Sequence, residues 1–223
     1  MKVLITFFGL AFSALLPLIN PLGSSLVFLG LVPAASPDVY RALAQRIAIS
    51  TTLFLVIIEV AGTAMLKFFG ISLPVMQVTG GIVLATMGRD MLSDRDSRST
   101  EPATEASLAD GDLQSAESKV FYPLTFPITA GPGCIVVLIT LSAHASAEHG
   151  FADVAAHAGI MLAVVMLSVL VYVCYGFAPA IAARVRPQTA HGVLRVIAFV
   201  LMCIGVQIAW NGAELLIRSL PPR

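Results

Sequence analysis

Two short segments combine proline, glycine and a polar residue inside long apolar runs. Residues 17–24 read Pro-Leu-Ile-Asn-Pro-Leu-Gly-Ser, and residues 127–134 read Pro-Ile-Thr-Ala-Gly-Pro-Gly-Cys. Proline removes a backbone donor and clashes with the preceding turn, and glycine allows backbone angles that other residues avoid, so a helix should open at each segment. Freed carbonyl and N–H groups at membrane depth are tolerated only where protein covers them or a wet cavity lies beside them. We therefore expect the polar backbone of these two breaks to bind a small solute or an ion.

Either break alone has a simpler interpretation, because proline and glycine are common in membrane helices and often only kink them. Two breaks at corresponding positions of inverted halves instead indicate a transporter site near the membrane midplane, where the N-terminal ends of half-helices face an anionic group. The residues predicted to bind substrate at the breaks are Asn20, Pro21, Gly23, Thr129, Ala130, Gly131, Pro132 and Gly133.

Three further side chains are candidates for the same site. Glu59 lies inside an apolar run, where an ionisable residue is costly and marks a functional position. It either couples ion movement to transport, accepts a structural hydrogen bond, or lies near the outer face. Gln207 and Asn211 are four residues apart on one helix face, so both amides would reach the same cavity or, alternatively, the same neighbouring helix.

The remaining reactive side chains indicate neither a metal nor a cofactor. We expect the histidines at the surface, in or beside loops, and the cysteines as buried apolar groups without a disulfide framework. Pairing Ser24 or Ser25 with a histidine would make a hydrolase, but the histidines fall outside the depth of these serines, so the chain is not expected to be an enzyme. The residues concerned are His144, His149, His157, His191, Cys134, Cys174 and Cys203.

The elements that position these residues are membrane helices. Of the 223 residues, 57% are hydrophobic and 12% are charged, and the mean hydropathy is +0.90, well outside the range of soluble domains. The net charge of zero excludes nucleic acid as a partner. A bilayer core needs roughly 20 helical residues, and the runs are continuous rather than alternating, which excludes a β-barrel. The predicted fold is all-α with six spans, at residues 3–32, 47–66, 71–88, 120–143, 154–183 and 194–217.

Charge divides the chain into two halves. Residues 89–119 hold 12 of the 26 charged residues and are predicted as a flexible loop. Nine of the 13 Lys and Arg residues fall on the side of this loop, so the positive-inside rule places the loop in the cytoplasm and both termini outside. Residues 1–88 and 120–223 then form three-helix repeats of opposite orientation, each with a broken first helix. Val83-Leu84 and Gly88 match Val200-Leu201 and Gly205 at a constant offset of 117.

These motifs resemble the MarC family of bacterial and archaeal inner-membrane proteins. The resemblance runs from the first span to the sixth, and the segment from Thr129 to Gly133 is its most specific part. Two positions depart from the family pattern: Cys134 replaces the usual hydroxyl residue, and Arg89-Asp90 is a charged end for a span. The motifs are Asn20-Pro21-Leu22-Gly23, Phe69-Gly70-Ile71-Ser72-Leu73-Pro74, Gly80-Gly81-Ile82, Pro123-Leu124-Thr125, Pro127, Thr129-Ala130-Gly131-Pro132-Gly133, Gly205-Val206-Gln207 and Asn211-Gly212.

The resemblance implies a six-helix protein of the neutral amino acid transporter class, distantly related to amino-acid exporters of the LysE type. We therefore expect alternating access with a neutral amino acid as substrate and the lipid bilayer as surroundings. Separately from the resemblance, the sequence predicts coupling to protons through Glu59 or, alternatively, to sodium through the backbone carbonyls around Asn20 and Thr129. The alternative is a membrane scaffold or assembly subunit that transports nothing. The sequence leaves the oligomeric state open, including a homo-oligomer.

Overall fold

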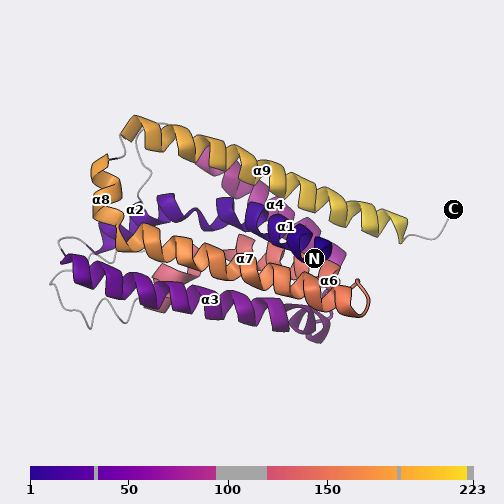
Figure 1. Cartoon of the computed structure of the whole chain (residues 1–223). Helices are drawn as coiled ribbons and strands as arrows, with labels where there is room; N and C mark the ends of the chain where they lie inside the picture. The colour runs from indigo at the N-terminus through magenta and orange to yellow at the C-terminus, as the bar shows by residue number, and fades with distance from the viewer. Residues whose placement is uncertain (33–34, 94–119, 185–186, 220–223) are drawn as a thin grey trace.

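The computed structural model describes residues 1–32, 35–93, 120–184 and 187–219, with the backbone alone for 187–191. In this described part every regular element is a helix, which confirms the all-α prediction (Figure 1). The elements are α1 (Lys2–Ile19), α2 (Pro21–Leu31), α3 (Pro37–Phe68), α4 (Leu73–Ser93), η1 (Val120–Thr129), α6 (Pro132–Ala145), α7 (Phe151–Gly176), α8 (Ala178–Arg184) and α9 (Pro187–Arg218). Of the predicted loop at 89–119, the first residues continue α4, and 94–119 lie outside the described residues.

Helix boundaries follow local chemistry, and α3 shows how. Ser36 caps the helix by accepting a hydrogen bond from Val39 N at 3.4 Å, and Pro37 occupies the first position, which needs no amide donor. Asp38 in the first turn and Lys67 in the last turn complement the helix dipole. The resulting 32-residue helix is about 48 Å long at 1.5 Å per residue, more than a bilayer core requires.

Four stretches are long and apolar enough to cross a membrane, at 2–31, 37–68, 151–176 and 192–218, and the bent pair formed by η1 and α6 makes a fifth candidate. The predicted third span corresponds to α4, which is not among these candidates. Glycine, threonine and Gln77 dilute its apolar residues, and Arg89 and Asp90 lie near its end. The structure therefore supports up to five spans by length and composition.

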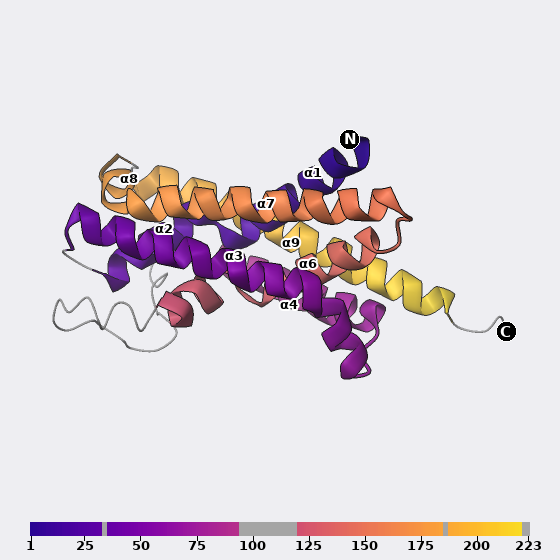
Figure 2. The same cartoon turned by 60° about the horizontal axis from the view of Figure 1, so that its bottom comes forward.

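Helices α3 and α7 run antiparallel along most of their length (Figure 2). Gly176 at the end of α7 lies against Arg41 near the start of α3. At the other end of the pair, Glu59 in the last third of α3 meets His157 in the first third of α7. Helix α1 packs closely on the first half of α7, where a Cβ on Gly159 would lie 2.4 Å from the Leu4 carbonyl oxygen.

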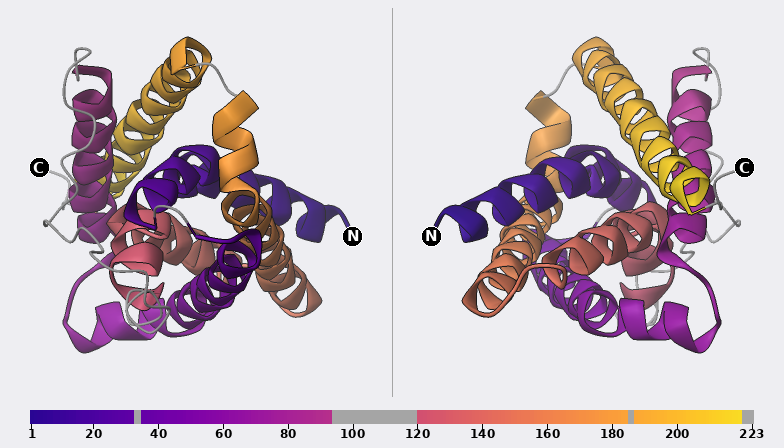
Figure 3. Two further views of the ribbon diagram at one scale, coloured as in Figure 1. Left: turned by 90° about the vertical axis from the view of Figure 1, so that its left-hand side faces the viewer. Right: turned by 90° about the vertical axis from the view of Figure 1, so that its right-hand side faces the viewer.

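Helices α4 and α9 form a second antiparallel pair, visible at one side of the bundle in the end-on views (Figure 3). Their backbones touch at glycines: a Cβ on Gly81 would lie 2.4 Å from Ala209 N, and one on Gly205 would lie 2.4 Å from Ala85 N. Gly205 follows Gly81 by 124 residues, and Ala209 follows Ala85 by 124 residues, so the two contacts mirror each other. The contacts of Gly88 with Met202 N and Ala198 O, and of Gly212 with Val78 N and Pro74 O, follow the same offset. Gly88 thus corresponds to Gly212 in this packing, and not to Gly205 as the offset of 117 in the sequence suggested.

The N-terminus, the turn between α6 and α7 and the C-terminal end of α9 lie at the same end of the bundle (Figure 1). An even number of crossings would produce this arrangement.

Candidate functional site

The first break separates α1 from α2 at Asn20, whose φ of 42° and ψ of 62° lie in the left-handed region. Asparagine tolerates this region because its short side chain bonds locally, and here Asn20 Oδ1 accepts a hydrogen bond from Gly23 N at 3.2 Å. Pro21 then starts α2 at the position where proline is favoured. The Ser24 hydroxyl lies 3.2 Å from the Ile19 carbonyl oxygen and 2.9 Å from that of Asn20. The predicted opening of this helix is confirmed.

The second break separates η1 from α6, which meet at an angle of 68°. The backbone of η1 is extended at Tyr122 and Phe126, and proline follows each of them and disfavours helical angles there. Gly131 is also extended, with φ −75° and ψ 179°, and Pro132 begins α6 as Pro21 begins α2. The predicted opening is confirmed here as well, and both half-helices start at a proline.

A cluster of three hydroxyls, formed by Ser24, Thr129 and Tyr175, connects the two breaks. The Thr129 hydroxyl donates to the Leu124 carbonyl oxygen at 2.6 Å, so it accepts a hydrogen bond from the Tyr175 phenol at 2.8 Å. The Ser24 hydroxyl lies next to the same phenol, and its own proton goes to the Asn20 carbonyl oxygen at 2.9 Å. Residues from α2, η1 and α7 therefore meet at one phenol. The two breaks, which are far apart in the sequence, lie close together in the structure.

The hydroxyl cluster is shielded from the surface. Thr129 and Tyr175 are 0% exposed and Ser24 is 6% exposed. The Tyr175 ring lies with its centroid 4.8 Å from that of Phe28, which closes one side of the cluster. A neutral set of hydroxyls next to the N-terminal ends of α2 and α6 suits a small solute that carries a carboxylate but no net charge.

The other residues predicted at the breaks have different surroundings. Ala130 is fully buried, and Pro132 is exposed. A Cβ on Gly131 would meet only the Pro127 carbonyl oxygen, at 3.1 Å, so space is open there. A Cβ on Gly133 would lie 2.3 Å from Leu84 Cδ2, which makes Gly133 a packing position against α4.

Gln207 and Asn211 bond each other, with the Gln207 Nε2 donating to the Asn211 Oδ1 at 2.9 Å. Both are exposed. Gly205 faces α4, and Gln207 is rotated about 200° from it around α9, so the amides point away from α4. No described contact joins them to the hydroxyl cluster, and their part in binding stays a prediction.

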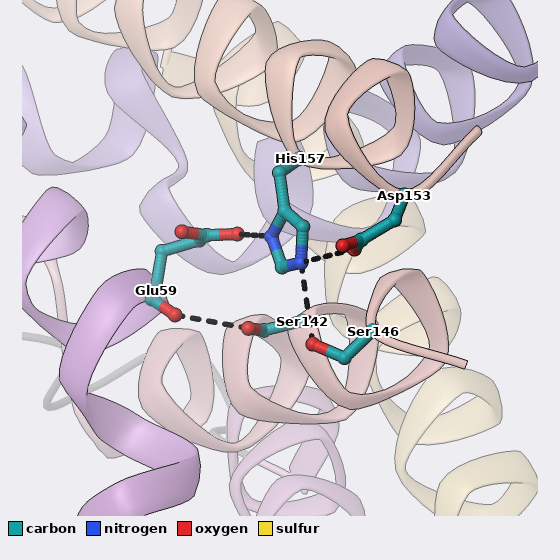
Figure 4. Close-up of polar contacts among 5 residues, drawn as sticks. All are labelled: Glu59, Ser142, Ser146, Asp153 and His157. Carbon is teal, nitrogen blue, oxygen red and sulfur yellow. Dashed lines mark hydrogen bonds and ion pairs between the residues drawn. The ribbon is translucent and has the colours of Figure 1, made fainter. Parts of the chain in front are cut away.

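Glu59 is 3% exposed and lies between α3, α6 and α7 (Figure 4). Its Oε1 contacts His157 Nδ1, and its backbone carbonyl accepts a hydrogen bond from the Ser142 hydroxyl at 2.9 Å. His157 was expected at the surface beside a loop, and this prediction is wrong: it lies inside α7 and is partly buried. The reason is that α7 already begins at Phe151, so residue 157 lies inside the helix and not beside a loop. It lies on the side of α7 that packs against α3, where it meets Glu59.

Two other expectations from the sequence concern the cysteines and a metal site. Cys134 and Cys174 are buried as expected, whereas Cys203 is exposed. Among the described residues, no group of three His, Cys, Asp or Glu side chains could hold a metal ion.

Sequence reasoning missed Tyr175 and the partner of Glu59. A tyrosine in an apolar run reads as one more aromatic side chain, and the three-residue spacing from Tyr172, which puts both on one side of α7, does not distinguish the two phenols. Tyr172 is 37% exposed, and Tyr175 is 0% exposed.

A groove of about 510 Å³ lies between α4 and α9. Its walls are almost entirely apolar, and they include Gly81, Val206 and Trp210. None of the residues predicted to bind substrate lines it, so this groove is separate from the hydroxyl cluster.

Comparison with known proteins gives consistent matches over nearly the whole chain. The family described as MarC family integral membrane protein matches residues 5–217. The UPF0056 inner membrane protein MarC of Escherichia coli O1:K1 is 27% identical over 211 residues, covering 95% of this chain and 96% of that protein. Its counterpart in Salmonella arizonae is 27% identical over 213 residues, with the same coverage. No solved structure matches this chain.

Proposed function

This chain belongs to the MarC family of integral membrane proteins, and from that premise we propose that it transports small zwitterionic solutes, above all neutral amino acids, by alternating access. One observation carries the proposal: the Tyr175 phenol hydrogen-bonds Thr129 at one helix break and lies next to Ser24 at the other. A scaffold has no need for two opened helices whose freed polar groups meet in the interior. A transporter uses such openings to hold its substrate.

The chemistry of the hydroxyl cluster suggests how a substrate would be held. The carboxylate of an amino acid would lie at the N-terminal ends of α2 and α6, where backbone N–H groups and the helix dipole favour negative charge. Hydroxyl groups of Ser24 and Thr129 and freed carbonyls would receive the ammonium group. The cluster offers no charged partner for a substrate side chain, which favours neutral amino acids.

Alternating access requires two halves that move against each other, and the packing supports this. Gly81 and Gly88 on α4 recur as Gly205 and Gly212 on α9 at one offset of 124 residues, and each of these glycines meets the backbone of the other helix. The pattern of neighbours is also reciprocal, because α1 and α2 pack on α7 while η1 and α6 pack on α3. We infer two inverted three-helix repeats with α4 as the sixth span, whose polar and glycine-rich face α9 covers.

Glu59 is the proposed coupling residue for protons, and sodium coupling at the carbonyls of the two breaks is the alternative. It is a buried carboxylate that faces a histidine rather than a fixed cation, so its charge can change during a transport cycle. The matched E. coli and Salmonella proteins are named inner membrane proteins, and we place this protein in an inner membrane as well. The N-terminus and the C-terminal end of α9 lie at one end of the bundle, and the predicted orientation puts that end outside.

Transport in proteoliposomes tests the proposal. Labelled neutral amino acids should exchange across the membrane with the wild-type protein, and Tyr175→Phe should lose most of that exchange because Thr129 loses its hydrogen-bond partner and the phenol next to Ser24 is removed. Tyr172→Phe removes an exposed phenol from the same helix and should keep full activity. If no neutral amino acid moves under any ion gradient while the protein is folded, the scaffold alternative becomes the better account.

A further inference from the structure

Three ionisable side chains form a graded series from the surface to the interior of the helix bundle. The side chains of Asp153, His157 and Glu59 are 41%, 29% and 3% exposed. His157 Nε2 lies 3.1 Å from Asp153 Oδ1, and His157 Nδ1 contacts Glu59 Oε1. The imidazole thus stands between a partly exposed Asp153 side chain, whose Oδ1 is buried, and the buried Glu59; Figure 4 shows the order of the three side chains.

We propose that Asp153 and His157 form a proton path to Glu59, with Asp153 as the port at the surface and His157 as the relay. This inference rests on the proposed function, because it supplies the proton that Glu59 would use for coupling. Glu59 has almost no exposed surface, so a proton that reaches it from this end of the bundle passes through a neighbouring group. His157 is that neighbour among the described contacts of its carboxylate.

The proton balance closes without any further reactant. In the starting state Glu59 is ionised and accepts the Nδ1 proton of a neutral imidazole. An incoming proton, received through the Asp153 carboxylate, adds to Nε2, while the Nδ1 proton passes to Glu59 Oε1. The imidazole ends neutral with its proton on Nε2, the carboxyl is neutral, and one proton has been taken up. Reversal of the two transfers releases it.

The other contacts of His157 suit a proton relay better than the activation of Ser146 as a nucleophile. Ser146 Oγ lies 3.2 Å from His157 Nε2, and with Glu59 on Nδ1 this resembles a hydrolytic triad. However, Asp153 Oδ1 also lies 3.1 Å from this nitrogen, and it is buried without a hydrogen-bond partner among the described residues. A carboxylate at ion-pair distance therefore competes with Ser146 for the same nitrogen. Ser146 is instead one more polar group at the exposed entrance.

The other ionisable groups at this end of the described bundle make no described contact with His157. On the elements packed against His157, the ionisable groups at this end of the bundle are exposed, and no described contact joins them to His157. His144 is turned away, with its Nδ1 2.7 Å from the Thr140 carbonyl oxygen of its own helix. The groups are the N-terminus and Lys2 on α1, Lys67 on α3, His144 on α6, and Glu148 and His149 in the turn.

Time-resolved infrared spectroscopy after a pH jump tests the relay in the full-length protein in liposomes. The carboxyl band that disappears in Glu59→Gln reports protonation of Glu59. His157→Gln keeps hydrogen bonding but cannot carry a proton. In this variant the band should rise at least about tenfold more slowly than in the wild-type protein. Asp153→Asn should also slow it, and the control His149→Gln, an exposed histidine of the adjacent turn, should leave it unchanged.

An unchanged rate in His157→Gln would overturn the relay. Nitrogen-15 spectra of the wild-type imidazole give a second readout that needs no folded variant: the proton should move from Nδ1 to Nε2 as Glu59 becomes protonated, and a fixed tautomer would also refute the path. Neither measurement uses a substrate. Loss of transport with an intact relay would therefore count against the proposed function alone.

Discussion

Replacing Gly205 by alanine should destabilise the contact between α4 and α9. The new Cβ would lie 2.4 Å from Ala85 N and 2.7 Å from the Gly81 carbonyl oxygen, whereas ordinary contacts begin at 3.4 Å. Both neighbours are backbone atoms, so neither can rotate away, and the helices must separate by about 1 Å. Overpacking of this kind costs about 1–3 kcal/mol, and alanine returns up to about 1 kcal/mol in helix propensity. With the full helix gain, the net loss in the free energy of unfolding is up to about 2 kcal/mol.

The mirrored contact provides an internal check on this reasoning. A Cβ on Gly81 would lie 2.4 Å from Ala209 N and 2.5 Å from the Gly205 carbonyl oxygen, so Gly81→Ala should cost about as much. One separation of the helices relieves both clashes, so the double variant should lose less than the sum of the single losses. Gly192→Ala is the matched control on α9, because nothing lies within 4 Å of its added Cβ.

Unfolding in mixed micelles with increasing dodecyl sulfate measures these differences. Trp210 is the single tryptophan of the chain and lines the groove between α4 and α9, so its fluorescence reports separation of this pair. The Gly205→Ala midpoint should fall while that of Gly192→Ala stays or rises. Equal midpoints for these two variants, or strictly additive losses in the double variant, would refute the backbone contact as the source of stability.

Three further predictions concern topology, the breaks and coupling. In a background without the exposed Cys203, an external thiol reagent should label Glu148→Cys but not Asp90→Cys, and the reverse pattern would invert the orientation. Gly131→Leu should abolish transport in a folded protein, because its Cβ meets only one carbonyl oxygen, whereas Gly133→Leu should lower thermal stability through its clash with Leu84; full transport in Gly131→Leu would reduce the second break to a kink. Glu59→Gln should abolish accumulation driven by a proton gradient and leave downhill exchange, and a variant that still accumulates substrate would favour sodium coupling at the breaks.

The sequence by itself determined the features that depend on neighbouring residues. Continuous apolar runs require helices, and a proline after Asn20 or Gly131 ends one helix and begins the next through local steric effects. Both breaks could therefore be placed correctly. The cost of burying a carboxylate in an apolar run likewise singled out Glu59 without knowledge of its partner.

Tertiary structure decided which of these residues meet. Tyr175 joins Thr129, 46 residues away, and His157 joins Glu59, 98 residues away. Helices such as α7 are apolar around most of their circumference, so periodicity does not reveal which face turns toward which neighbour. That rotation is set by close packing, as where Gly159 admits the backbone of α1. The sequence therefore located the openings, and the packing of helices around them decided which side chains gather there.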